Sequence, residues 1–301
     1  ETYTFAEQLA TFSPTDEVTI RGGFAGTESS ATARSSDARS TLDGADAFNP
    51  LVLANTGAVT IERIDFTRAR EHGIMKTGAG NVAIRDCDFL GNAVNGSNLN
   101  GRGVSIAGTE GTTEVEISNC RFVGNVSTQE TWGQYCGNGM GAFLSKLKRA
   151  TLDSCLFLTN GYALTVSDGM HKYFSHSGGA IYASAAPLTL RRCRFVGNAI
   201  PGGASAVYLG GASDGSAFEN CAFVLNQNRL ARDNASQSGT SVGAVAVSLG
   251  AVEQTLDVVN CTFANNIASG NDSPGGLNVV KGTVNVRNCI FRGNRKTAGS
   301  I

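Results

Sequence analysis

The sequence predicts an all-β fold: a right-handed parallel β-helix (a solenoid) of about nine to ten coils, with loop inserts along one edge. Three observations predict it: a repeated motif, a strand that recurs before the motif, and a glycine-rich, charge-poor composition. Self-similarity at a period of tens of residues indicates one structural unit stacked on itself. We expect a single domain over residues 1–301, with an N-terminal cap region at 1–30 and regular coils over 57–301.

The repeated motif is Cys-x-Phe-x-x-Asn, which occurs seven times. Its fixed residues are Cys87, Phe89 and Asn92; Cys120, Phe122 and Asn125; Cys155, Phe157 and Asn160; Cys193, Phe195 and Asn198; Cys221, Phe223 and Asn226; Cys261, Phe263 and Asn266; and Cys289, Phe291 and Asn294. A decayed eighth copy has Ile64 and Phe66, but Ala69 stands where the asparagine belongs. Equivalent positions of a stacked repeat form columns, so we expect an internal ladder of phenylalanine rings.

A single unit shows how the motif fits a coil. Gly179–Tyr182 is a short apolar strand, and a pair of alternating leucines follows after a turn. Two consecutive arginines then break the alternation, which turns Cys193 and Phe195 inward. The shortest interval, from Ile64 to Cys87, is 23 residues. That length holds three short strands and three bends, and each strand would pair in parallel with the neighbouring coils.

The strongest competing fold is the leucine-rich repeat, whose units also end in an asparagine ladder. The segment after each asparagine shows no helical period, and the strand before each cysteine has no counterpart in that fold. We therefore favour the β-helix. The asparagine should lie at a bend, because its side chain tolerates left-handed backbone geometry and can bond to neighbouring coils.

Seven of the eight cysteines share one position in the repeat. Stacked neighbours would lie about 4.8 Å apart, which is within the disulfide range. Side chains in register point the same way, however, and this would strain such bonds. We therefore favour buried free thiols that act as small hydrophobic groups. Cys136 lies outside the motif.

Composition excludes several function classes. Charged residues make up only 16% of the chain, and the net charge is −1 with no basic cluster. Phosphate binding needs clustered Lys and Arg, so we predict no nucleic-acid partner. No apolar run approaches the roughly twenty residues that span a bilayer, so we predict no transmembrane segment in this chain. No motif indicates a cofactor, and we predict none.

The two ends of the chain differ. Phe5, Leu9 and Phe12 have helical spacing, but Tyr3 and Phe5 also alternate as in a strand, and either element would cover the first coil. The chain begins at Glu1 without a signal peptide, as expected of a mature or trimmed form. No comparable cover follows the last motif, so we expect either a continuation beyond this chain or end-to-end self-association.

The motif also carries a family resemblance. Gly178–Ile181, a Gly-Gly-Ala-Ile strand, combines with Phe-x-x-Asn in a pattern that resembles chlamydial polymorphic outer-membrane proteins and related autotransporter passengers. Val18–Glu28, Thr41–Gly44 and Val59–Phe66 look like the opening of secreted bacterial β-helix proteins. The resemblance covers nearly the whole chain. It implies the β-helix fold and an extracellular or cell-surface bacterial location, but no particular chemistry.

Four long inserts separate the asparagine from the next strand. They cover residues 93–102, 126–139, 161–178 and 227–241. Equivalent positions of a β-helix project from one edge, so we expect these inserts to form a continuous ridge. Loops on a rigid scaffold are where binding residues usually lie.

Two adjacent inserts concentrate aromatic and polar residues that suit a sugar ring, which has an apolar face and a hydroxylated rim. The candidate ligand-binding residues are Trp132, Tyr135, Tyr162, Asp168, His171, Tyr173 and His176. The alternative interpretation is that these aromatic side chains pack the two loops against each other. His171 and His176 with Cys136 have no zinc-type spacing, and we predict no metal site.

A carboxylate cluster offers an enzymatic alternative. Asp65, Asp86 and Asp88 fall on two successive coils, and β-helix lyases and hydrolases use carboxylates in such positions. Arg63 and Arg121 flank the cluster, so its structural interpretation is a solvated ladder of opposite charges.

We therefore predict a secreted or cell-surface scaffold, adhesin-like, that contacts a carbohydrate or another surface protein through the ridge. The alternatives are a polysaccharide lyase or glycoside hydrolase of the pectate-lyase-like superfamily, and a structural subunit that stacks end to end. Catalytic residues are not identifiable from the motif.

Overall fold

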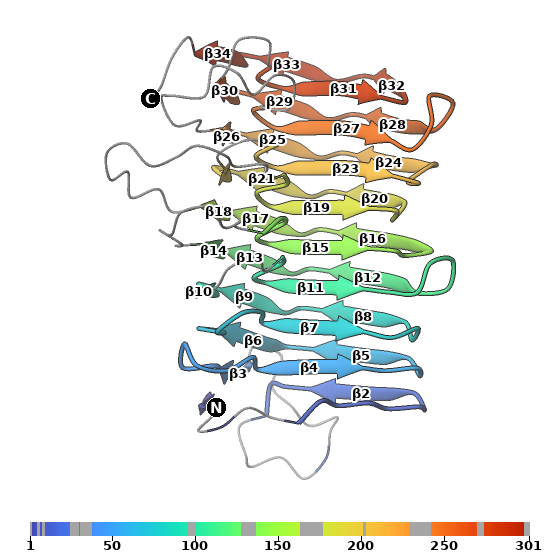
Figure 1. The fold of residues 1–301 in the computed structure, drawn as a ribbon. Helices are drawn as coiled ribbons and strands as arrows, with labels where there is room; N and C mark the ends of the chain where they lie inside the picture. Colours follow the sequence, from blue (N-terminus) through green and yellow to red (C-terminus); the bar gives the residue numbers. More distant parts are fainter. Residues whose placement is uncertain are drawn as a thin grey trace.

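The protein is a column of stacked coils, with the first and last coils at opposite ends (Figure 1). The computed structural model describes residues 2–4, 7, 10–24, 30, 38–94, 100–127, 137–162, 177–200, 203–228, 242–269 and 274–297. In these residues the regular elements are all β-strands, and every strand pairing is parallel. The prediction of an all-β, right-handed parallel β-helix is confirmed.

Three sheets form the long walls of the column, and each coil from β4 onward contributes one strand to each. The eight-stranded sheet contains β4 (Leu51–Ala54), β7 (Ile74–Thr77), β11 (Val104–Ala107), β15 (Ala142–Ser145), β19 (Ile181–Ser184), β23 (Val207–Gly211), β27 (Val245–Leu249) and β31 (Leu277–Lys281). The nine-stranded sheet contains β2 (Val18–Arg21), β5 (Val59–Glu62), β8 (Val82–Arg85), β12 (Glu114–Ser118), β16 (Arg149–Asp153), β20 (Leu188–Arg191), β24 (Ser216–Glu219), β28 (Thr255–Val259) and β32 (Thr283–Arg287). The ten-stranded sheet contains β1 (Thr2–Thr4), β3 (Ser40–Asp43), β6 (Ile64–Thr67), β9 (Asp88–Leu90), β13 (Arg121–Val123), β17 (Leu156–Leu158), β21 (Arg194–Val196), β25 (Ala222–Val224), β29 (Thr262–Ala264) and β33 (Ile290–Arg292).

A fourth sheet of very short strands follows the asparagine bend. It contains β10 (Ala93–Val94), β14 (Val126–Ser127), β18 (Gly161–Tyr162), β22 (Ala199–Ile200), β26 (Gln227–Asn228), β30 (Ile267–Ser269) and β34 (Arg295–Thr297). The 23-residue coil from Ile64 to Cys87 contains three strands, β6, β7 and β8, as predicted, and each of the later, longer coils adds a fourth. The first residues of the predicted inserts belong to this seven-stranded sheet, because the coils above and below offer them pairing partners.

A single left-handed residue before each repeat cysteine, and before Ile64 of the decayed copy, turns the chain from the nine-stranded to the ten-stranded sheet. The eight residues have φ between 51° and 56°, and they are Arg63, Asp86, Asn119, Ser154, Arg192, Asn220, Asn260 and Asn288. This extra residue resets the alternation of side chains. Leu190 and Cys193, three positions apart, both face the core as a result.

A second left-handed residue precedes each ladder asparagine, and this corrects the prediction that the asparagine itself is left-handed. The seven residues have φ between 53° and 62°, and they are Gly91, Gly124, Thr159, Gly197, Leu225, Asn265 and Gly293. The turn falls one residue early because the asparagine side chain has to point inward, where it is buried. Glycine holds four of the seven positions, as expected where φ is positive.

The asparagine ladder is confirmed. Asn125 Nδ2 donates to the carbonyl of Phe89, at 2.9 Å, and to Oδ1 of Asn160, also at 2.9 Å. The same Oδ1 accepts the backbone N–H of Asn125, at 3.2 Å. Ala69 lacks the side chain, but its N–H still donates to Asn92 Oδ1 at 3.0 Å. The decayed copy therefore loses the carboxamide bonds without leaving its own buried N–H unpaired.

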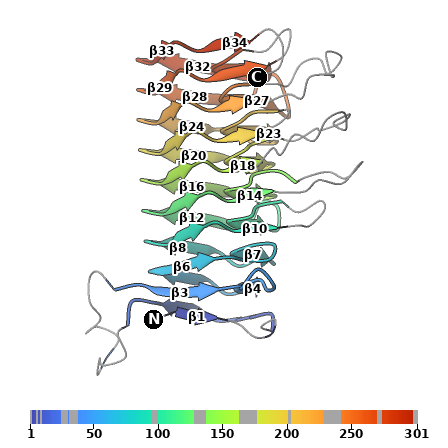
Figure 2. The same cartoon turned by 90° about the vertical axis from the view of Figure 1, so that its left-hand side faces the viewer.

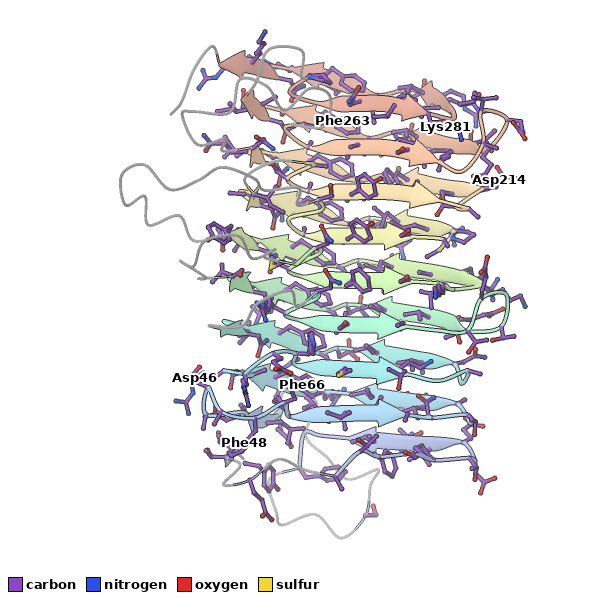
Figure 3. The ribbon with its side chains drawn as sticks, viewed as in Figure 1. Asp46, Phe48, Phe66, Asp214, Phe263 and Lys281 are labelled. Carbon is purple, nitrogen blue, oxygen red and sulfur yellow. The ribbon has the colours of Figure 1, made fainter. Side chains whose placement is uncertain are left out.

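Phenylalanine rings stack through the core from Phe66 to Phe291. Successive ring centroids lie between 4.5 and 5.1 Å apart, close to the spacing of paired strands. Phe66 and Phe263 mark two levels of this stack in Figure 3. The ring of every coil except the last is fully buried, so the stack is the axis of the hydrophobic core.

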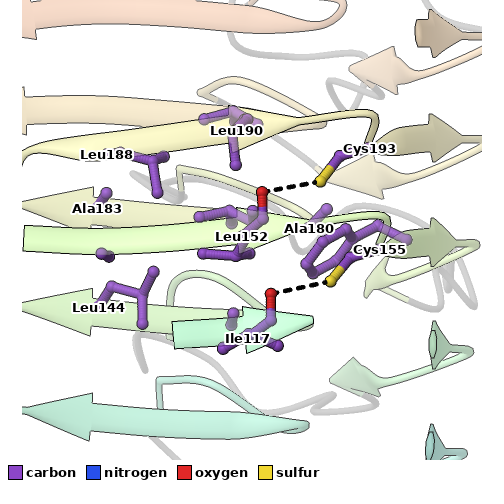
Figure 4. Packing of buried hydrophobic residues seen from close by; sticks show 14 of the residues in the cluster. Ile117, Leu144, Leu152, Cys155, Ala180, Ala183, Leu188, Leu190 and Cys193 are labelled. Carbon is purple, nitrogen blue, oxygen red and sulfur yellow. Dashed lines mark hydrogen bonds between the residues drawn. The ribbon is translucent and has the colours of Figure 1, made fainter. Parts of the chain in front are cut away.

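The cysteines of the repeat are free thiols on the inner side of the bend. Cys155 Sγ donates to the carbonyl of Ile117 at 3.5 Å, and Cys193 Sγ donates to that of Leu152 at 3.4 Å (Figure 4). Six of the seven thiols bond to the coil before them in this way, and Cys221 Sγ donates to the carbonyl of Glu219 in its own coil. Six of the seven are buried, and Cys289 in the last coil is half-buried.

The described part of the N-terminal region contributes strand pairing rather than a helix. In β1, Tyr3 pairs with Leu42 of β3, and Phe12 makes a parallel bridge with Leu53 of β4. Phe5 and Leu9, which the helical interpretation needs, lie outside the described residues. Along the described segments there is no helix long and apolar enough to cross a bilayer.

Candidate functional site

The predicted ligand site lies largely beyond what the structure describes. Trp132, Tyr135, Asp168, His171, Tyr173 and His176 all lie outside the described residues, as does Cys136. Tyr162 is described: it ends β18, is half-buried and pairs with Ser127 of β14. Whether these side chains come together therefore stays a prediction.

The inserts do share a common origin. Each begins with a short strand of the seven-stranded sheet, namely β10, β14, β18 or β26. Figure 2 shows β10, β14 and β18 one above another on one side of the column. The points of departure are therefore aligned along a single edge, as a ridge of inserts requires.

An aromatic stack on the outer face of the eight-stranded sheet is a candidate site that the sequence analysis did not identify. Phe143 of β15, Tyr182 of β19 and Tyr208 of β23 pair in register. Their ring centroids lie 5.4 and 4.9 Å apart, with interplanar angles of 7° and 9°. All three side chains are half-buried and lie opposite to the core-facing positions of their strands.

This aromatic stack adjoins the places where inserts rejoin the coils. A Cβ added to Gly101 would lie 2.9 Å from Cβ of Phe143, and one added to Gly139 would lie 2.8 Å from the backbone nitrogen of Tyr182. Both glycines also have positive φ, at 71° and 61°. The chain re-entering from two inserts is therefore held close against the aromatic stack by residues without side chains.

The surface beside the aromatic stack is lined by small residues. The neighbouring outward column, two residues further along each strand, consists of Ala107, Ser145, Ser184, Gly210 and Ser248. Tyr208 lies over Gly210, where an added Cβ would meet Cε1 of its ring at 2.6 Å. Burial, and then the neighbouring Tyr208, raise the pKa of Tyr182, so its hydroxyl stays protonated and able to donate. The combination of aromatic rings, phenol hydroxyls and small polar neighbours suits a hydroxylated ligand.

The predicted carboxylate cluster is a closed ion network. Asp65 and Asp88 are paired in register on adjacent coils. Arg39 Nε lies 2.6 Å from Asp65 Oδ1, and Arg39 Nη2 lies 3.4 Å from Asp88 Oδ1. Arg121 holds Asp88 from the other side, with Nε 3.0 Å from both carboxylate oxygens. Burial is the main reason that the pKa of Asp65 is raised, and the hydrogen bond from Arg39 partly offsets it.

Two features of this network differ from the sequence interpretation. Asp88 is buried, so the ladder of opposite charges is not a solvated one. Asp86 occupies the left-handed turn before Cys87 rather than a position in the network. Arg39 was missed because it precedes β3, well before the first motif, and its proximity depends on how the coils stack.

The core also contains a lysine. Lys76 of β7 occupies the inward column between Leu53 and Ile106, and it is fully buried. Its Nζ donates to the carbonyl of Gly78 at 2.6 Å. Burial lowers the pKa of Lys76 to about 8. Among the described residues there is no ion-pair partner for it and no group of three or more His, Cys, Asp or Glu that could hold a metal.

Comparison with known proteins agrees with the fold. The family model described as a right-handed β-helix region matches residues 22–223, which is more than half of the chain. Neither the curated proteins nor the solved structures contain a match. On the strength of the family match and the stacked parallel sheets, the chain belongs to the right-handed β-helix family.

Proposed function

We propose that this β-helix is a secreted or cell-surface bacterial scaffold, adhesin-like, that binds a glycan or another surface through its insert-bearing edge. The observation that supports it most directly is the aromatic stack of Phe143, Tyr182 and Tyr208 beside the re-entry points of two inserts. Aromatic side chains with polar tips are typical of sites that contact sugars, because they offer an apolar surface and a hydrogen-bonding group together.

The column architecture suits this role. Its coils hold the departure points of the inserts at one strand spacing, so a row of sites along the edge would repeat at a fixed interval. An extended polymer could then contact several coils at once, and weak contacts on each would add through their proximity. The resemblance to surface proteins supports the proposed location.

Binding to immobilised glycans tests this proposal. We expect Tyr182→Ala and Tyr208→Ala to weaken binding of any glycan that the intact chain retains, by about tenfold each, because each removes a ring and a hydroxyl. Trp132→Ala and Tyr173→Ala test the predicted contribution of the inserts. Val252→Ala is the matched control, since Val252 is exposed in the turn between β27 and β28, away from the inserts. Equal binding by all these variants would contradict the proposal.

One observation favours an enzymatic candidate as well. Asp65 and Asp88 are neighbouring carboxylates, and burial raises the pKa of Asp65, as is typical of a carboxyl group that acts as a general acid. Both carboxylates are bound by arginines, however, which is typical of a structural network. A screen of acidic and neutral polysaccharides for reducing or unsaturated ends decides the matter. Release of such ends by the unaltered chain, and its loss in the Asp65→Asn variant, would favour an enzyme.

A further inference from the structure

The outer face of the eight-stranded sheet carries no charge over seven successive coils. In its strands from β4 to β27 the outward positions, which alternate with the core-facing ones, contain no Asp, Glu, Lys or Arg. These strands lie one above another in Figure 1. Every strand of the nine-stranded sheet, by contrast, contains at least one charged side chain. One wall of the column is therefore uncharged, although another wall of the same coils is not.

A column of hydroxyl groups runs along this uncharged wall. Its positions are Ser145, Ser184, Gly210 and Ser248, which are in register on four successive coils. Gly210 has no side chain, but the hydroxyl oxygen of Tyr208 lies 2.9 Å from the place that a Cβ of Gly210 would take. Tyr208 thus supplies the hydroxyl that Gly210 lacks, and this hydroxyl column has one member in each of the four coils.

The hydroxyl column is accessible and lies beside the aromatic stack. Its side chains are half-buried rather than buried, so a ligand can reach them. Serine side chains one strand spacing apart, about 4.8 Å, are too short to bond to each other. Phe143, Tyr182 and Tyr208 each precede a position of the hydroxyl column by two residues. Three successive coils therefore offer a ring and a hydroxyl together, as a hydroxylated ligand requires.

The same wall offers little to a protein partner. In strands β4 to β27 of this sheet no large apolar side chain is exposed, and no outward position holds arginine or tryptophan. Contacts between proteins usually depend on a few large anchoring side chains that become fully buried. A thin, hydroxyl-rich chain matches this wall better than a second protein surface does.

From the absence of charge and the hydroxyl column, we propose that the ligand beside the aromatic stack is a neutral polysaccharide that lies along the axis of the column. This inference rests on the proposed function and names its ligand class. Sugar hydroxyls would exchange bonds to water for bonds to one hydroxyl in each coil. A carboxylate or sulfate group would lose hydration on the wall without meeting a cation there.

Lys146 is the one feature near the hydroxyl column that would favour an acidic ligand. It follows Ser145 in the turn that leaves β15, and it is exposed. The residues that follow the equivalent positions of the neighbouring coils are Gly108, Ala185 and Gly211, which are uncharged. An acidic polymer along the axis would therefore meet this cation in one coil only, whereas a neutral polymer would find a hydroxyl in each.

Matched polysaccharides test the inference on the 301-residue chain. The probes are a neutral glucan, galactan, mannan and xylan, each compared with its own carboxymethylated and sulfated derivatives. We expect at least one neutral polymer to be bound, and its derivatives to bind about tenfold more weakly. Because no ion pair forms, the affinity for the neutral polymer should change by less than about twofold between about 0.05 and 0.5 M salt.

Charged variants locate the contact. Ser184→Asp and Ser184→Lys should each weaken binding of the neutral polymer by about tenfold, because either sign of charge must be desolvated. Ser184→Ala, which removes the hydroxyl alone, should weaken it by about threefold and serves if a charged variant changes the circular dichroism spectrum. Thr189→Asp is the matched control, since Thr189 is half-buried on the nine-stranded sheet of the same coil, and it should bind like the unaltered chain.

The outcomes separate this inference from the proposed function. Preference for a carboxymethylated or sulfated polymer, lost at high salt, would overturn the neutral ligand class and leave glycan binding intact. Unchanged binding by all Ser184 variants would place the contact away from the hydroxyl column and would also overturn the inference. Failure to bind any of the polymers would contradict both the inference and glycan binding itself.

Discussion

Each ladder asparagine from Asn92 to Asn266 joins three coils through bonds that no pairwise sequence pattern reveals. Asn160 donates from Nδ2 to the carbonyl of Phe122 on the coil before it, at 2.8 Å, and to Asn198 Oδ1 on the coil after it, at 3.0 Å. Its Oδ1 accepts two bonds from Asn125. A buried group that loses its only partner costs more than the bond itself contributes.

Replacing Asn160 by alanine should therefore destabilise the solenoid strongly. The change leaves the Phe122 carbonyl and the Asn125 side-chain and backbone donors without their partner, so we expect a loss of about 3 kcal/mol in the free energy of unfolding. Asn285→Ala, which removes only an exposed bond to Asp257, is the control and should cost less than about 1 kcal/mol. Urea denaturation measures both, and equal losses would contradict this account.

Lys76 should make stability depend on alkaline pH. Its folded pKa is about 8, below the ordinary 10.5, so the unfolded chain binds more protons between these values. The free energy of unfolding is therefore highest above about pH 10.5, where Lys76 is neutral in both states. It falls by up to about 3 kcal/mol as the pH is lowered to 8. Lys76→Met should be more stable than the unaltered chain at pH 7, and their difference should shrink at pH 10. Unfolding free energies at both pH values test this, and a pH-independent difference would contradict it.

At the scale of the element, the cysteine column predicts a gradient of reactivity. Six of its thiols are buried, whereas Cys289 in the last coil is half-buried. Only a solvent-accessible thiolate reacts with an alkylating reagent. Peptide mapping after brief treatment of the native protein should find Cys289 modified first, and the other six only after denaturation. Equal labelling of Cys155 and Cys289 in the native state would contradict this.

The sheets differ in how well the sequence predicts their strands. The ten-stranded sheet was predictable from β9 to β33, because Cys-x-Phe marks both the position of each of these strands and its inward face. The strands of the seven-stranded sheet are two or three residues long, as in β18, and such segments are too short to show an alternating pattern. They become strands only because neighbouring coils present partners at the right spacing.

At the scale of the whole molecule, the repeat was sufficient for the fold but not for the candidate site. Phe143, Tyr182 and Tyr208 are unremarkable outward residues in three separate strands, and only the register of the coils brings their rings together. The Asp65–Asp88 pair was predictable because both residues follow the same repeat position. Arg39, which binds them, has no such marker. Contacts between equivalent positions of successive repeats can thus be predicted from the repeat spacing. Contacts made by residues outside the repeats, such as Arg39, cannot.

The direction of the interstrand hydrogen bonds has a mechanical consequence. They run along the axis of the column, and the first and last coils lie at opposite ends of it (Figure 1). Tension applied between the two ends therefore acts on the hydrogen bonds between every pair of neighbouring coils in series. The least stable terminal coil should detach before the next coil is strained. Such a molecule would lengthen under load in successive steps, each releasing one turn of polypeptide, and so would absorb a sudden pull without failing all at once.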